Sequence, residues 1–405
     1  YITKEHESGY KLLNAPDLVW SDHKAFRPVD VKMGPDGALY IADWFDTITE
    51  HETVNFRDGH RDSKHGRIWR LTYKERPLVE RPGLKTASIR QLLNALKEPE
   101  QWTRDQARRR LQDLSGSQVV PAIRSWIRSL DSGPDLDRLF LEAMRLTEFH
   151  VGTVNNTLLM YLLDSKDHQV RAATVRTLSR LPQIKSPLPL LKKAATDNHH
   201  RVRLEAVNAL RKLGTADAAE TAMFAIDKHV DRYIDYALWL TATELEPLWL
   251  AKIQRGDNAF GGNMRHAAYA IRASGNPSAL KSIVSDFRKN EIIGRDWHTA
   301  LRLISEMGDG AAQDVLFELA FATDRLTTPQ RQDIIDALER AAARKKPRPQ
   351  HPERLLELFR VHDEGILSSA ARLAGRWQLE EAIDRLSEFA LSDLTTEHLR
   401  EAAID

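Results

Sequence analysis

The chain has 405 residues, and its 59 lysines and arginines nearly balance 58 aspartates and glutamates, leaving a formal charge of +1. That balance gives no reason to expect nucleic acid or an anionic membrane as a partner. The absence of cysteine excludes disulfides, cysteine-ligated zinc and covalently attached haem c within these residues. The length allows two or three domains of about 150 residues, or one long array of repeats.

Neither a membrane span nor a signal peptide is visible. The apolar stretch YALWLTATELEPLWL (236–250) is interrupted by Glu244 and Glu246 and is too short to cross a bilayer. Tyr1 opens within a segment that has the pattern of folded structure. We therefore expect the sequence to be a piece of a longer polypeptide.

Residues 18–73 carry the pattern of short β-strands. Four segments rich in β-branched and aromatic residues are bounded by turn residues: 17–20, 28–33, 38–44 and 66–73. Within 34–37 a turn is expected, because Pro35 fixes φ and Gly37 can adopt a positive φ. We predict one antiparallel sheet, about the size of a propeller blade, within a domain over 1–80. The long loop or the first helices should cover its apolar face, which includes Val29, Val31, Leu39 and Ile41.

From about residue 85 the apolar period becomes helical, and the pattern repeats. VRAATVRTL (170–178) and VRLEAVNAL (202–210) are the clearest copies. A small residue recurs at intervals of 31–37 residues, at Ala107, Ala143, Thr174, Ala206, Ala237, Ala268, Ala300, Ala337 and Ala370. A period in the thirties with two helices per unit is typical of an α-solenoid.

We therefore predict a mainly α fold: an α-solenoid of about nine helical repeats over 85–405, preceded by one small antiparallel β-sheet. The small residues let neighbouring helices approach closely, so Ala143, Ala206, Ala237 and Ala268 should be buried at helix–helix contacts. Trp239 and Trp249 occupy helical positions and are predicted to lie in the core.

One unit of the array, DNHHRVRLEAVNAL (197–210), resembles a HEAT repeat. It has the Asp-x-x-x-x-Val-Arg pattern followed by a spaced alanine and leucine. The short unit length is most similar to the PBS-lyase type of HEAT-like repeat. Because solenoids of this kind mostly bind other molecules, the resemblance implies architecture more than activity.

The first 80 residues carry a second resemblance. FRPVDVKMGPDGALYIADW (26–44) and FRDGHRDSKHGRIWRLTYKERPLV (56–79) resemble the final blade of glucose/sorbosone-dehydrogenase-type β-propellers. The variant concerned is a membrane-bound dehydrogenase domain of very large exported bacterial proteins, in which HEAT repeats and then a c-type cytochrome follow the propeller. WFDTIT (44–49) departs from that pattern, where a Trp-Tyr-Asn-Pro-type turn is usual.

The resemblance implies a blade remnant of a quinoprotein that oxidises sugars or alcohols with pyrroloquinoline quinone (PQQ) and calcium. It also implies an exported protein, periplasmic or in the cell envelope, whose partners are the remaining blades and a cytochrome domain carrying haem c. The catalytic histidine of such enzymes lies on an earlier blade. The resemblance thus implies no catalytic residue here, and this chain alone should be inactive.

The cofactor of such enzymes lies at the mouth of the propeller channel, where arginines pair with its carboxylates. By resemblance, Arg27 is the first candidate for such a contact. The further candidates for the channel rim are Asp30, Asp43, Arg57, Asp58, His65 and Arg67.

The loop over 45–66 admits a second interpretation. His51, His60 and His65, together with Asp58 and Asp62, suggest a metal site. Their spacing fits no standard zinc or EF-hand pattern. We therefore predict a loop braced by hydrogen bonds and by local ion pairs, Arg57 with Asp58 and Arg61 with Asp62, and no metal.

The alternative to an oxidoreductase part is a non-catalytic scaffold. In that case the blade remnant caps the solenoid, and the helical surface holds a protein or polysaccharide partner. The basic segment RAAARKKPRPQHPER (340–354) is compatible with an acidic partner, although an ordinary solvated insertion explains it more simply.

Overall fold

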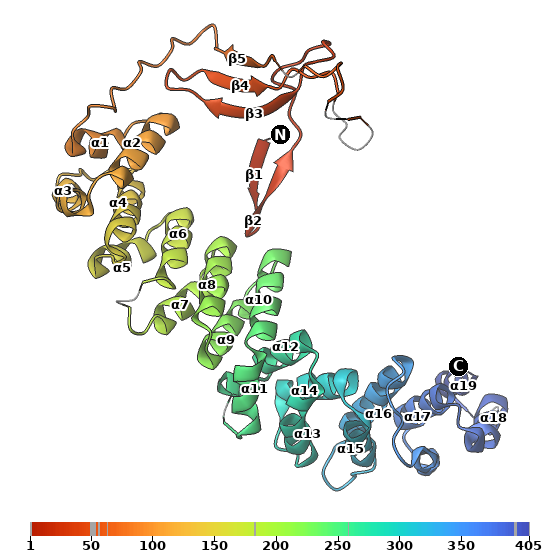
Figure 1. The fold of residues 1–405 in the computed structure, drawn as a ribbon. Helices are drawn as coiled ribbons and strands as arrows, with labels where there is room; N and C mark the ends of the chain where they lie inside the picture. Colours follow the sequence, from red (N-terminus) through yellow and green to blue (C-terminus); the bar gives the residue numbers. More distant parts are fainter. Residues whose placement is uncertain are drawn as a thin grey trace. The chain divides into compact units, whose positions relative to one another are not determined.

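The computed structural model describes residues 2–48, 54–55, 57–62, 64–181, 184–257, 259–392 and 395–404. The chain falls into two compact units, Tyr1–Pro187 and Leu188–Asp405. The first unit contains the strands and six helices of its described residues, and the second is helical (Figure 1). The predicted change from strand to helix near residue 80 therefore lies inside the first unit.

Two small antiparallel sheets open the chain. Strands β1 (Ile2–His6) and β2 (Gly9–Leu13) form a hairpin that the sequence analysis missed. Strands β3 (Pro28–Met33), β4 (Leu39–Asp43) and β5 (Arg67–Leu71) form a three-stranded sheet in the order β3-β4-β5. The strand predicted at 17–20 is wrong. Those residues pair with no strand in the described part of the chain, and Leu18 and Trp20 are exposed.

One face of the three-stranded sheet is apolar and largely uncovered. The register places Val31 opposite Ile41 and Ile41 opposite Trp69, so these side chains share a face. Ile41 is buried, whereas 52% of Val31 and 64% of Val29 are exposed. The prediction that Val29 and Val31 would be covered is therefore wrong. The first helices pack mainly among themselves, and Val29 and Val31 remain exposed on this face.

The helices of the first unit pack in two rows. The bounds are α1 (Ile89–Ala95), α2 (Gln101–Asp113), α3 (Gly116–Arg128), α4 (Leu136–Val151), α5 (Asn156–Leu163) and α6 (His168–Leu178). Helices α2, α4 and α6 follow one another in one row, while α1 packs against α3 in the other. Leu93, Leu111 and Ile123 lie in the core between the rows, at most 1% exposed.

The second unit repeats this arrangement. Its α-helices are α7 (Leu188–Ala195), α8 (His200–Leu213), α9 (Ala216–Ala222), α10 (Arg232–Glu244), α11 (Glu246–Gln254), α12 (Met264–Ser274), α13 (Lys281–Arg288), α14 (Gly294–Met307), α15 (Gly310–Ala320), α16 (Thr328–Ala343), α17 (Glu364–Trp377), α18 (Ile383–Leu391) and α19 (Glu397–Ile404). Short 3₁₀ helices join them: η1 (Met223–Asp227), η2 (Ala259–Gly262), η3 (Pro277–Leu280), η4 (Pro352–Arg360) and η5 (Glu380–Ala382).

In this unit α8, α10, α12, α14, α16 and α17 each pack on the next, and the intervening helices form the second row (Figure 1). Repeated helix pairs of this kind make an α-solenoid, as predicted.

Every small-residue position of the sequence repeat is buried. The nine side chains, from Ala107 to Ala370, are at most 4% exposed. They lie on the helices that pack on one another in sequence, which are α2, α4 and α6 in the first unit and α8, α10, α12, α14, α16 and α17 in the second. Trp249 is buried as predicted. The prediction for Trp239 is wrong, because 43% of it is exposed and it stacks on Tyr236 at 5.8 Å between ring centroids.

Ion pairs join successive helices of one row. Arg108 on α2 pairs with Glu142 on α4 at 2.8 Å, and Arg211 on α8 pairs with Glu244 on α10 at 2.7 Å. Arg372 on α17 repeats the pattern with Glu339 on α16 at 3.2 Å. Among the described residues, no helix is long and apolar enough to cross a membrane.

Candidate interaction surfaces

Asp43, the last residue of β4, is a hydrogen-bonding hub of the three-stranded sheet. Its Oδ1 accepts from the backbone N–H groups of Arg27 at 2.8 Å and Phe45 at 3.1 Å. Its Oδ2 accepts from Arg67 Nε and Trp69 Nε1, both at 2.9 Å. Two side chains predicted from the resemblance, Asp43 and Arg67, therefore meet, together with the backbone of Arg27.

The electrostatics of this hub are already balanced. Burial alone would raise the pKa of Asp43, but hydrogen bonds from Arg27 N–H and Trp69, with the charge of Arg67, hold that pKa below its ordinary value. The Arg67 guanidinium lies 4.0 Å from the ring centroid of Phe45 and 5.0 Å from that of Trp69. Arg67 is thus a neutralised and stacked cation.

The other predicted cofactor residues are dispersed. Arg27 is half-buried, and its Nη1 donates to the Phe26 carbonyl at 2.8 Å. Asp30 is exposed and pairs with Lys32 at 2.9 Å, while Arg57 is exposed on the loop. Around this sheet the structure brings Asp43 and Arg67 into direct contact and leaves Asp30 and Arg57 apart from them.

The loop histidines pair locally. Asp58 accepts from the backbone N–H of His60 and contacts the His60 ring at 2.8 Å, and Asp62 contacts His65 in the same way. Arg61, whose side chain is only 6% exposed, donates to the carbonyls of Ile48 and Val54. These contacts brace the loop as predicted, but its ion pairs among the described residues differ from the predicted ones: Asp58 and Asp62 pair with His60 and His65, and Arg61 lies 3.7 Å from Asp46. His51 lies outside the described residues.

A second surface is a row of arginines on the second unit. Two cavities of about 620 and 370 Å³ adjoin along α12, α14 and α16, and His298 and Arg302 line both. We call these two cavities together the arginine groove. Its cationic side chains are Lys228, Arg265, Arg272, Arg302, Arg340 and Arg344. Three carboxylates line the same cavities: Asp235, Glu306 and Asp333. Cations therefore outnumber carboxylates six to three.

Glu306 is the centre of this groove. Its carboxylate lies 3.0 Å from Arg272, 2.9 Å from Arg302 and 3.2 Å from Arg344. Burial would raise the pKa of Glu306, but hydrogen bonds from Arg302 and Arg344 outweigh it and lower that pKa. Arg340 forms no ion pair within the described part of the chain and is exposed. The groove is thus shaped to surround a carboxylate and retains spare positive charge.

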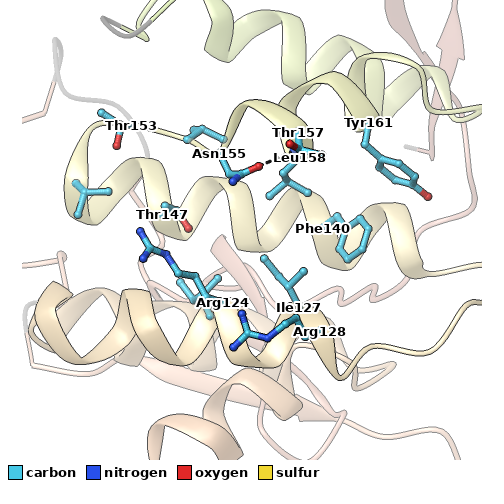
Figure 2. A pocket seen from close by; sticks show the side chains of 13 residues that line it. Arg124, Ile127, Arg128, Phe140, Thr147, Thr153, Asn155, Thr157, Leu158 and Tyr161 are labelled. Carbon is cyan, nitrogen blue, oxygen red and sulfur yellow. Dashed lines mark hydrogen bonds between the residues drawn. The ribbon is translucent and has the colours of Figure 1, made fainter.

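A third surface is a cavity of about 560 Å³ in the first unit, which we call the apolar groove (Figure 2). Helices α3 and α5 each pack on α4, and the groove opens between them. Buried Ile123 and Val154 line it with the apolar side chains Ile127, Phe140 and Leu158. Arg124 and Arg128, one helical turn apart on α3, are its charged residues.

The sequence analysis missed both grooves. Arg340 and Arg344 belong to the basic segment 340–354, which gave a signal for an acidic partner. The apolar groove gave no such signal, because its lining comes from three helices and no single segment shows the pattern.

Comparison with known families agrees with the helical architecture. Residues 155–238, which run from the start of α5 into α10, match the family model described as HEAT repeats. Residues 3–75, which run from the second residue of β1 to just beyond β5, match a model described as a domain of unknown function, DUF7133. No curated protein matches the chain. The predicted HEAT repeats are therefore confirmed, and the strand-bearing segment matches a domain model whose description names no activity.

Proposed function

We propose that this chain is a non-catalytic scaffold that holds an acidic segment of a protein partner in the arginine groove. The observation that carries the proposal is the convergence of three arginines on Glu306 within a groove that extends over three successive helices. HEAT repeats support a scaffold role, because stacked repeats present extended binding surfaces.

Glu306 illustrates the chemistry of recognition. Arginine presents a planar fork of N–H donors that suits carboxylates, and charge-assisted hydrogen bonds are about twice as strong as neutral ones. A partner's aspartate or glutamate would find the same donors at Arg340 and Arg265, where the charge is less fully matched.

The partner is a peptide segment and not a uniformly charged polymer. Asp235, Glu306 and Asp333 line the groove together with the cations, so a regularly sulfated or phosphorylated chain would be repelled by them. Val230 and the ring of Tyr269, both half-buried, add apolar surface among the charges. A segment that mixes acidic and apolar residues satisfies both features.

The test measures binding of a fluorescent glutamate-rich peptide, with glutamates interspersed among alanine and leucine, to the whole chain. Arg340→Glu should weaken binding about tenfold or more, since one charge-assisted contact is lost and a repulsion is added. Arg295→Glu is the control, because Arg295 is exposed on α14 and does not line the groove. Equal weakening by both variants, or tighter binding of a heparin fragment than of the peptide, would overturn the proposal.

The partly exposed apolar face of the β3-β4-β5 sheet favours a second candidate, the quinoprotein part. Such a face needs a neighbour, and a further propeller blade would supply one. In this candidate the neighbouring blades and a cytochrome carrying haem c belong to an exported protein, and PQQ with calcium binds at the channel mouth. Arg27, Asp30, Asp43, Arg57, Asp58, His65 and Arg67 are its proposed rim residues.

The pairing of Arg67 with Asp43 leaves Arg27 as the main cationic candidate for the PQQ carboxylates. The experiment is PQQ titration of the calcium-loaded parent protein. Arg27→Ala should raise the dissociation constant about ten- to a hundredfold. A parent protein that binds no PQQ would leave the scaffold as the surviving function.

A further inference from the structure

We propose that the apolar groove is a second docking site, for an amphipathic helix of a protein partner that carries two acidic residues one turn apart. This site lies in the first unit and shares no residue with the arginine groove. It is therefore independent of the function proposed above.

The groove exists because the spacing of helices changes locally. Helix α1 packs directly on α3, but α3 packs principally on α4, and α5 packs on both α4 and α6. The short α5 follows the left-handed Gly152, and its cap, Asn155, accepts from the Leu158 N–H at 3.0 Å. The result is an open channel between α3 and α5, floored by α4 (Figure 2).

The floor and walls of the channel are apolar. Ile123 is 1% exposed and Val154 6%, so the base is solid core, and the rings of Phe140 and Tyr161 meet edge to face at 5.3 Å. Cavities of about 300–1,000 Å³ are the usual size of ligand sites, and this one falls in that range. Helix-in-groove recognition uses apolar anchors at helical spacing against such a surface.

Charge defines the occupant. Arg124 and Arg128 are exposed and four residues apart on α3, and neither forms an ion pair within the described part of the chain. Like charges at this spacing repel each other, which costs helix stability. A partner helix with acidic residues at positions i and i+4 would match both guanidiniums and relieve that repulsion.

Two cations favour a peptide helix over a fatty acid. A fatty acid has an apolar tail but only one carboxylate, so it brings one negative charge to two guanidiniums and leaves one positive charge unbalanced. The opposite side of the groove adds Thr153, Asn155 and Thr157, whose polar groups suit a peptide's polar edge.

The experiment uses fluorescence polarisation with the whole chain and a panel of fluorescent amphipathic helical peptides. The peptides share a leucine and phenylalanine stripe and carry Glu-x-x-x-Glu or, as the matched probe, Lys-x-x-x-Lys. We expect acidic members of the panel to bind and the Arg124→Glu/Arg128→Glu chain to bind them at least tenfold more weakly. The reversed chain should instead prefer the lysine probes, which loss of folding cannot produce.

Two controls complete the test. Arg109→Glu changes an exposed arginine on α2 outside the groove and should leave binding unchanged. Leu158→Asp places a charge in the apolar wall and should abolish binding of every probe. Absence of binding by all acidic probes, no exchange of preference in the reversed chain, or displacement only by dodecanoate would each overturn the proposal. Arg340→Glu should not affect these probes, so failure here and failure of the scaffold function are distinguishable.

Discussion

At the scale of single residues, the carboxylate of Asp43 organises the three-stranded sheet. One buried side chain accepts four hydrogen bonds that reach from the segment before β3 to β5. Replacing this carboxylate by the amide of asparagine leaves the Arg67 guanidinium without its counter-ion. It also places the asparagine NH₂ group, itself a donor, opposite groups that donate to the carboxylate. We expect Asp43→Asn to destabilise the sheet by about 1–3 kcal/mol.

The measurement is protection of the β4 and β5 amides against hydrogen exchange. Asp30→Asn is the matched control, because Asp30 is exposed and its contacts are local. It pairs with Lys32 and accepts from the backbone N–H of Val31. Equal protection in both variants would show that Asp43 does not organise the sheet.

Asp36 gives a prediction about pH. The hydrogen bond from Arg70, aided by the Ala38 N–H and the Tyr40 hydroxyl, lowers the pKa of Asp36 from 3.8 to about 2. A lowered pKa in the folded state stabilises the sheet above the unfolded value, and this contribution is lost as pH falls through the folded pKa. The sheet should therefore lose stability between about pH 4 and pH 2.

Carboxyl carbon chemical shifts followed by NMR should report that pKa directly. In Arg70→Gln the pKa of Asp36 should return toward 3.8. An unchanged low pKa in that variant would assign the shift to the turn and not to the arginine.

At the scale of elements, the buried alanines set the distance between neighbouring helices. Ala206 on α8 is 0% exposed, and α8 packs on α10. Ala206→Leu inserts three carbons into a filled contact, so the free energy of unfolding should fall by about 1–3 kcal/mol.

Urea unfolding followed by circular dichroism measures this cost. Ala343→Leu makes the same change at the exposed end of α16 and should alter stability by less than about 0.5 kcal/mol. Equal effects of the two variants would mean that burial of Ala206 does not determine helix spacing.

The elements also show what sequence reasoning can reach. The solenoid was predictable because the period of small and apolar residues is local and repeats from Ala107 to Ala370. Strands depend on distant partners, so an apolar segment at 17–20 was mistaken for a strand. The β1–β2 hairpin was missed because its polar run Lys4-Glu5-His6 hides the alternation.

The surfaces were harder to predict than the elements. Trp239 has a helical position typical of core residues, yet its side chain lies outside, stacked on Tyr236. Glu306 and Arg344 are 38 residues apart in sequence and meet only through the packing of α14 on α16. No local pattern encodes such a meeting.

At the scale of the whole molecule, the division near residue 188 predicts that the second unit folds alone. Helices α7, α8 and α9 pack on one another, and α8 packs on α10, so the unit has its own core. A chain of residues 188–405 should be helical by circular dichroism and unfold cooperatively with urea.

A shorter chain of residues 216–405 provides the comparison. It lacks α7 and α8 and exposes the side of α10 that packs on α8. It should therefore unfold at a lower urea concentration than 188–405. Identical midpoints would show that α7 and α8 add nothing to the unit.

The regular interval between small residues has a consequence for how such a chain can change its length. Ala206, Ala237 and Ala268 are separated by 31 residues each, and the helices that carry them pack on one another in sequence. An in-frame genetic duplication of any 31-residue window between them would add one helix pair whose two faces match those already present. This part of the chain can therefore evolve by gain or loss of whole repeats. A gained repeat would lengthen the binding surface and leave the existing core packing unchanged.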